Sequence, residues 1–168
     1  MKRPDQTWLI DDGPFGLLAR VLDHRWDWPA STLHMARAVA DGGARDKSGR
    51  RQQLLSRQNS GQPWIRVHGI QPGTPAAGML YNHLRHNRYQ STEHLGEHAS
   101  IALAATTLPT AVFVTMDKGA AFLALAELGR DRVATPYELW NWLCAEGFIT
   151  MDCRLELLRL TSAALARL

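Results

Sequence analysis

The stretch 110–115, Thr-Ala-Val-Phe-Val-Thr, constrains the fold more than any other part of the chain. It is short, apolar and rich in β-branched residues, which is typical of a strand buried on both faces. The segment 7–10 has a similar character, and the turn sequence Asp11-Asp12-Gly13-Pro14 ends it abruptly. Strands of this kind predict a parallel sheet covered by helices on both sides.

The rest of the chain alternates between strand and helix patterns. We expect further strands at 64–70 and 132–134, and helices at 15–22, 31–40, 77–88, 93–106, 117–128, 135–147 and from 152 to near 168. The Gly-, Ser-, Gln- and Arg-rich segment 41–62 is expected to be a loop or a frayed helix. The pattern therefore predicts an α/β protein with a central, mainly parallel sheet, and the length of 168 residues fits a single domain, 1–168.

Composition excludes few functions. With 45% hydrophobic and 21% charged residues, the chain is an ordinary globular protein, and a net charge of +3 permits a polyanionic partner without requiring one. No apolar run is long enough for a signal peptide or approaches the roughly 18 residues that span a membrane. Cys144 and Cys153 have no metal-type spacing, so we expect reduced thiols in a cytoplasmic protein without a membrane partner.

Three distant carboxylates are predicted to lie at one edge of this sheet. Asp11 directly follows the first strand, and Asp117 lies just beyond the strand that ends at Thr115. Glu97 lies near the start of the helix that leads into the 110–115 strand. Such a helix runs antiparallel to the strands, so its beginning lies over their carboxyl ends, where ligands bind in these sheets.

Carboxylates that converge repel one another unless a cation neutralises them. Oxygen-rich clusters suit Mg²⁺ or Mn²⁺, which can assist attack on a phosphodiester. Each residue also has a structural interpretation that remains open. Asp11 can serve as a turn residue, Asp117 as a helix N-cap, and Glu97 as a favourable charge near a helix N-terminus.

Four segments resemble the PIN-domain ribonucleases, in the order in which that family has them. They are the first strand and turn Leu9-Ile10-Asp11-Asp12-Gly13-Pro14-Phe15, the Gly96-Glu97 helix that continues to Ala104, the strand end Thr115-Met116-Asp117-Lys118-Gly119, and the helix start Thr135-Pro136-Tyr137-Glu138-Leu139. The resemblance is closest to the VapC-like subgroup with an Asp-x-Gly/Ser-Pro turn and a Gly-Glu helix. Together the segments cover most of the chain.

The resemblance implies a three-layer αβα fold with the first strand at its centre. It implies a divalent-metal-dependent endoribonuclease that cuts single-stranded RNA, often as the toxin that a small antitoxin protein inhibits, and a tendency to form homodimers. Asp11, Glu97 and Asp117 would be catalytic residues that hold Mg²⁺ or Mn²⁺, and Thr115 would support them.

The sequence departs from the PIN pattern at one position. Family members usually carry another glutamate on the helix after the first connector, where this chain has His34 or Met35, and Asp41 comes a turn or more later. Asp12 also replaces a small hydroxyl residue of the family. Either Asp12 or Glu93 completes the site, or the protein is a degenerate PIN module that binds RNA or a protein partner.

A competing pattern is His94-Leu95-Gly96-Glu97-His98, which matches the His-x-x-Glu-His sequence of some zinc peptidases. Two histidines four apart on one helix face can share a zinc ion, with the glutamate as general base. Glu127 or Glu138 would then supply a third ligand. This alternative gives Asp11 and Asp117 no role.

Further candidates concern RNA and partner binding. Basic residues of the 45–66 segment can contact phosphates or form a solvated loop; they are Arg45, Lys47, Arg50, Arg51 and Arg57, with Trp64 and Arg66 following. Tryptophans can stack on bases or pack in the core, and one of Trp140 and Trp142 is expected to be exposed. The last helix, with Leu155, Leu158, Leu165 and Leu168, is expected to join the core or a dimer interface.

Overall fold

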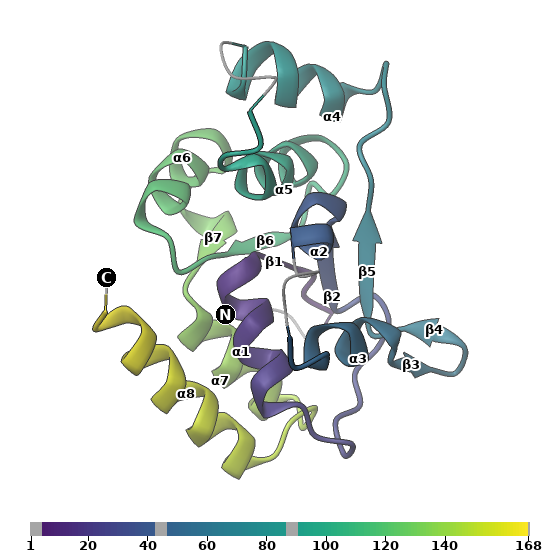
Figure 1. Ribbon diagram of the computed structural model, residues 1–168, viewed down its shortest axis with the longest axis vertical. Coiled ribbons are helices and arrows are strands. Elements are labelled where there is room, and N and C mark those ends of the chain that lie inside the picture. The colour runs from purple at the N-terminus through teal and green to yellow at the C-terminus, as the bar shows by residue number, and fades with distance from the viewer. Residues whose placement is uncertain (1–4, 43–46, 87–90, 168) are drawn as a thin grey trace.

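A five-stranded sheet, parallel throughout, forms the centre of the computed structural model, which describes residues 5–42, 47–86 and 91–167 (Figure 1). The strand order is β5-β2-β1-β6-β7. The strands are β1 (Trp8–Ile10), β2 (Leu33–Ala36), β5 (Ile65–His68), β6 (Val112–Val114) and β7 (Val133–Ala134). The predicted α/β class, with a mainly parallel sheet in a three-layer αβα arrangement, is confirmed.

Strand β1 is the central strand. Leu9 is in register with His34 of β2 on one side and with Phe113 of β6 on the other. All residues of β1 and β6 are buried, so helices cover both faces as the apolar pattern predicts. Because β1 and β6 are parallel neighbours, Asp11 and Thr115 emerge at the same edge of the sheet.

Helices cover the two faces of the sheet. Figure 1 shows α5 and α6 on one side and α1, α7 and α8 on the other. The helices are α1 (Asp12–Val21), α2 (Arg37–Gly42), α3 (Arg50–Ser56), α4 (Pro75–Gly78), α5 (Leu95–Thr106), α6 (Lys118–Leu128), α7 (Pro136–Ala145) and α8 (Met151–Leu165), with a 3₁₀ turn η3 (Arg130–Arg132). Within the described residues, none of these helices has both the length and the apolar character that crossing a membrane requires.

The prediction of a helix over 31–40 is wrong. Residues 33–36 form β2, which pairs with β1 and β5, and only α2 is helical in this stretch. The sequence Leu-His-Met-Ala has no strong β-preference of its own. Its conformation is decided by two flanking strands, which satisfy its backbone hydrogen bonds and bury all four side chains.

The described part of the segment 41–62, which leaves out residues 43–46, has more regular structure than predicted. It contains α3 and a short hairpin of β3 (Gln58–Asn59) and β4 (Gln62–Pro63). The helix predicted over 77–88 begins earlier, at α4, because the Thr74 side chain caps it by accepting from Ala77 N. It continues as the π-helix η2 (Met79–Leu84), and residues 87 and 88 of the predicted helix lie outside the described part.

The tryptophans belong to the core. Trp26 and Trp28 are buried, and Trp28 Nε1 donates to Trp64 O at 2.9 Å. The expectation that Trp140 or Trp142 is exposed is wrong, because both opposite faces of α7 are covered. Trp140 Nε1 donates to Thr161 of α8, while the Trp142 ring lies 5.5 Å from that of Trp8.

The last helix joins the core as expected, through Leu158 and through two leucines that were not among those predicted. Leu157 and Leu160 are buried, and Leu158 packs against the core from a partly buried position. Leu155 is 54% exposed, and Leu168 lies outside the described residues.

One arginine fastens the end of α5 to the sheet. Arg132 donates to the carbonyl oxygens of Ala104, Leu108 and Ala111, at 2.7 to 3.1 Å. One of them, Ala104 O, is in the last turn of α5, where carbonyls lack partners within the helix itself. The guanidinium group therefore holds α5, the loop after it and β6 together.

We expect Arg132→Met to lower the free energy of unfolding by about 2 kcal/mol, because buried carbonyls lose their donor. Urea unfolding followed by circular dichroism measures the change. Arg130→Met, at an exposed position two residues earlier, is the matched control and should stay within about 0.5 kcal/mol of wild type. Equal effects of the two substitutions would contradict this role of Arg132.

Candidate functional site

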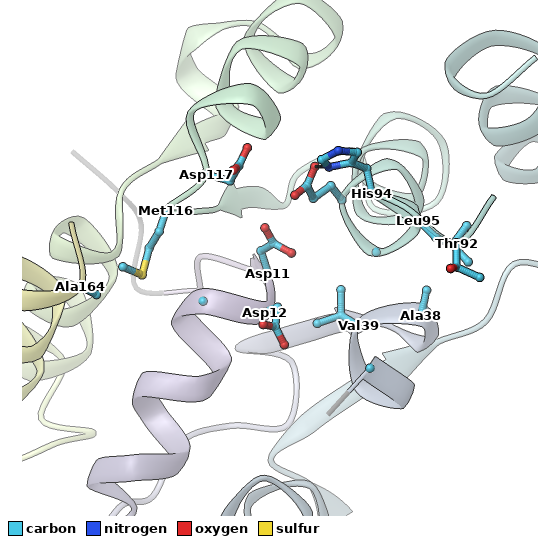
Figure 2. A pocket seen from close by; sticks show the side chains of 14 residues that line it. Asp11, Asp12, Ala38, Val39, Thr92, His94, Leu95, Met116, Asp117 and Ala164 are labelled. Atoms are coloured by element: carbon cyan, nitrogen blue, oxygen red, sulfur yellow. Dashed lines mark hydrogen bonds and ion pairs between the residues drawn. The ribbon is translucent and has the colours of Figure 1, made fainter. Parts of the chain in front are cut away.

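The predicted carboxylates line one cavity at the carboxyl-terminal edge of β1 and β6. Its volume is about 510 Å³. Its walls come from segments far apart in the sequence, and they include Asp11, Asp12, Gly13, Ala38, Val39, Thr92, His94, Glu97, Met116, Asp117 and Ala164. Figure 2 shows Asp11, Asp117 and His94 around one space, with Ala38 and Val39 on another side of it.

Asp11 is the most buried of the acids that line this cavity, with 6% of its surface exposed. It occupies the N-cap position of α1, yet its side chain makes no capping hydrogen bond there. Its Oδ2 instead accepts from Thr115 Oγ1 at 2.8 Å. Burial raises the pKa of Asp11, the bonds from Asp12 N and Thr115 oppose this rise, and repulsion by Asp12 and Asp117 adds to it. Asp11 is therefore more than a turn residue.

Asp117 has both of the roles that the sequence suggests. Its Oδ1 caps α6 by accepting from Ala120 N at 2.7 Å, so the N-cap interpretation is correct. The residue also lines the cavity, and its charge raises the pKa of Asp11 and of Glu97. Thr115 links the two aspartates, because its hydroxyl donates to Asp11 and accepts from Asp117 N at 3.1 Å.

Glu97 reaches the cavity from the first turn of α5. The preceding Gly96 allows α5 to approach α2 closely, since an added Cβ would lie 3.0 Å from Val39 Cγ2. Partial burial raises the pKa of Glu97, and repulsion by Asp11 and Asp117 raises it further. The three acids thus repel one another across a shared space, as the predicted topology requires.

His94 has a role that sequence reasoning missed. Its Nδ1 lies 3.0 Å from Glu97 Oε2, and its Nε2 lies 3.2 Å from Glu93 Oε1. Its backbone has a φ of 56°, a left-handed conformation that is uncommon for residues other than glycine. The spacing of three between His94 and Glu97 was the available signal, because such pairs meet near a helix start.

The rings of His94 and His98 lie 6.2 Å apart, but other contacts engage the residues of the zinc-peptidase pattern. α5 begins at Leu95, so His94 precedes the helix, and His98 is buried with its Nδ1 2.9 Å from Arg85 Nη1. The proposed third ligands are used elsewhere. Glu127 pairs with His83 at 2.8 Å, and Glu138 completes the predicted capping box of α7, with Thr135.

No acidic residue of α2 lines the cavity in place of the missing family glutamate. His34 and Met35 lie in buried β2, and α2 presents the apolar Ala38 and Val39 to the cavity. The candidates Asp12 and Glu93 are both engaged. Asp12 pairs with Arg51, while Glu93 contacts His94 and is not part of the cavity wall.

Of the basic residues proposed to contact RNA, those that the structure describes do not line this cavity. Arg50 donates to Arg20 O, Arg51 pairs with Asp12 and lies 5.2 Å from the Phe15 ring centre, and Arg57 lies 5.9 Å from the Trp64 ring centre. Lys47 is exposed, and Arg45 lies outside the described residues. Contact with RNA by these side chains stays a prediction.

The donor set fits a divalent cation by its chemistry. Asp11, Glu97 and Asp117 offer only oxygen atoms, and a cation would relieve the repulsion that raises two of their pKa values. Across the residues the structure describes, no three His, Cys, Asp or Glu side chains are already grouped as metal ligands. Glu97 is instead held by His94, so cation binding requires its carboxylate to turn.

The raised pKa of Asp11 predicts a pH-dependent cost in stability. Above the ordinary aspartate value of 3.8 the folded protein retains a proton that the unfolded chain has lost, so the free energy of unfolding falls as pH rises through the folded pKa. Asp11→Asn should therefore raise the Tm at about pH 7 in EDTA, by roughly 2–4 °C per kcal/mol recovered, and the gain should vanish towards about pH 4.

Thermal unfolding at the two pH values measures this effect. Asp131→Asn, at an exposed position on η3, is the control and should leave the Tm nearly unchanged at both. A Tm of Asp11→Asn below that of wild type at neutral pH would contradict the prediction. It would show that the hydrogen bond from Thr115 stabilises the protein more than the buried charge of Asp11 destabilises it.

Comparison with protein-family models, with curated proteins and with solved structures found no match to this chain. What can be inferred about its function therefore rests on its own residues and their arrangement.

Proposed function

We propose that this protein is a divalent-metal-dependent endoribonuclease of PIN type, in which Asp11, Glu97 and Asp117 hold Mg²⁺ or Mn²⁺. The observation that carries the proposal is the meeting of these three carboxylates in one cavity. They come from the end of β1, the first turn of α5 and the end of β6. They are also the acids at which the sequence resembles PIN domains.

Hydrogen bonds to neighbouring residues orient the two aspartates. Thr115 orients the buried Asp11 through a hydrogen bond, and the helix cap fixes one oxygen of Asp117. Glu97 can exchange its contact with His94 for the cavity centre. A divalent cation bound there would supply Lewis-acid stabilisation of the charge that develops on a phosphodiester during hydrolysis.

Single-stranded RNA is the proposed substrate, and a small antitoxin protein is a proposed partner. Both follow from the resemblance in the turn after β1, the Gly96-Glu97 helix start and the Thr115-Met116-Asp117 strand end. The strand order supports it, because β1 and β6 are neighbours and bring the first and third of these segments together. A homodimer in the cytoplasm is part of the same proposal.

The second candidate function is a PIN-like module that binds RNA or a protein without cutting. The observation that favours it is the apolar wall of α2, where Ala38 and Val39 line the cavity in place of an acid. The pairing of Asp12 with Arg51 also neutralises the nearest additional carboxylate. With Asp12 paired in this way, such a site would bind a cation more weakly than one with a further free acid on α2.

The deciding experiment compares cleavage of single-stranded RNA by wild type and by Asp117→Asn, with Mn²⁺ or Mg²⁺ and with EDTA. We expect Asp117→Asn to lose activity by about 100-fold or more, because it removes a charge that would hold the cation. Asparagine is also a good N-cap, so α6 and the fold should be preserved. Asp131→Asn is the matched control and should cleave like wild type.

Other outcomes identify the alternatives. Binding of Mn²⁺ or RNA by folded wild type without any cleavage would favour the binding module. Stoichiometric zinc that is lost on substitution of His94 and His98 would overturn the nuclease proposal.

A further inference from the structure

A second cavity adjoins the carboxylates. Its volume is about 930 Å³, and it shares a wall with the first cavity. The shared residues come from α2 and from the start of α5, and they are Ala38, Gly42, Thr92, Leu95 and Gly96. A chain-like ligand with one unit at the carboxylates would therefore place its next unit in this second cavity.

The two cavities differ in chemistry. The first is lined by four carboxylates, one of them Asp12, which pairs with Arg51. The second has one, Asp41, and presents Arg37 from α2, His68 from β5, Gln71 from the loop after β5 and Tyr81 from η2. Arg37 is exposed at the first position of α2. This set combines a cation, an amide, an imidazole and an aromatic ring, which are the groups that bind phosphates and bases of single-stranded nucleic acids.

His68 presents a defined hydrogen-bonding atom. The His34 Nε2 lies 3.0 Å from Ser31 O, which can only accept, so this nitrogen carries the proton. Neutral His34 then accepts through Nδ1 from His68 Nε2, at 2.7 Å, in a pair of stacked rings. Neutral His68 is left with an accepting Nδ1.

Charge on these imidazoles is disfavoured. Burial lowers the pKa of His34 to about 4, and burial with repulsion by Arg66 lowers that of His68. The acceptor at His68 is therefore retained at neutral pH, and it suits an amino group on the edge of a base.

Tyr81 also lines the second cavity, from the π-helix η2, with 45% of its surface exposed. Irregular helices of this type are frequent at functional sites. The helix is anchored by Arg85, which is 1% exposed and donates to Ser91 O and to Glu93 O. The anchor ties Tyr81 to the loop that leads into α5.

We propose that the second cavity holds the nucleotide next to the phosphodiester at the carboxylates, with Tyr81 stacked on its base, Arg37 on a phosphate and His68 Nδ1 accepting from the base. The assignment rests on the proposed function, since it takes RNA as the ligand. The cavity volume lies in the range of small-molecule sites. An aromatic ring on one wall and an arginine on another match a base and its phosphate better than a peptide strand, which needs exposed backbone partners.

The test is the affinity for a fluorescein-labelled single-stranded RNA of about ten nucleotides, measured by fluorescence anisotropy in EDTA so that no cleavage occurs. Tyr81→Ala should weaken binding by about tenfold, whereas Tyr81→Phe keeps the ring and should bind within about twofold of wild type. Phe122→Ala removes an aromatic ring that is 74% exposed on α6, outside both cavities, and should have no effect.

Arg37→Gln separates the phosphate contact from the stacking. It should reduce the salt dependence of RNA binding by about one unit in the slope of log affinity against log salt, while Tyr81→Ala leaves the slope unchanged. Arg130→Gln, exposed on η3, is the control and should leave both affinity and slope unchanged.

The outcomes separate this inference from the proposed function. Mn²⁺ titration by calorimetry reports on the carboxylates, and Tyr81→Ala should bind Mn²⁺ as wild type does. RNA binding that depends on Tyr81, with no Mn²⁺ binding, would keep the nucleotide site and overturn the nuclease. No RNA binding by wild type, equal RNA affinity of Tyr81→Ala and wild type, or equal competition by inorganic polyphosphate would overturn the nucleotide site, whether or not Mn²⁺ binds.

Discussion

The position of β1 is the constraint from which the rest of the structure follows. It pairs with strands on both sides and is covered on both faces, so the residue that leaves its carboxyl end starts from inside the protein. That residue is Asp11, and burying a carboxylate is costly unless hydrogen bonds or charges compensate it. Thr115 and the Asp12 amide supply only part of the compensation, because the pKa of Asp11 remains raised. The repulsion by Asp117 and Asp12 makes the cost larger. Perturbed carboxylates of this kind are common at functional sites, and on the proposed function a bound cation would remove the cost.

Residues beside the cavity also adopt conformations that reduce the stability of the fold. His94 adopts a left-handed backbone conformation and contacts Glu97 and Glu93, so the first turn of α5 is held by a strained residue. Gly96 is a poor helix former, yet it lets α5 approach Val39 closely enough for Glu97 to reach the cavity. Arg51, by contrast, neutralises Asp12 and limits the repulsion at the outer edge. The left-handed backbone of His94 and the low helix propensity of Gly96 therefore reduce stability beside the three carboxylates. Helix caps and arginine contacts stabilise the surrounding helices.

Much of this site could be predicted from the sequence, and the physical reason is locality. Asp11 and Asp117 follow strands that are recognisable as short apolar runs, and Glu97 follows from the direction of a helix in a parallel sheet. The Thr135 capping box is likewise a local pattern, and the structure has it. Strand β2 could not be predicted, because its pairing partners decide its conformation. Because a helix was predicted over 31–40, the position of Ala38 and Val39 in the cavity wall could not be predicted either. It depends on where β2 ends and α2 begins. The second cavity, which Tyr81 lines, could not be predicted from the sequence either, since it is formed where α2, α5, η2 and the loop after β5 meet.

Net charge is a poor guide to where a polyanion would bind on this protein. The net charge of +3 counts arginines that already have partners within the protein. Arg51 pairs with Asp12, and Arg132 donates to three carbonyl oxygens. The surface beside the candidate site is set by a few side chains instead. Carboxylates line one cavity, whereas the next has a single carboxylate, Asp41, together with Arg37 and His68, so it is much less acidic than the first. A phosphate beside the acids is repelled until a cation is present, whereas one beside Arg37 is attracted without it. On the proposed function, the second cavity therefore provides the affinity for RNA and the first provides the chemistry.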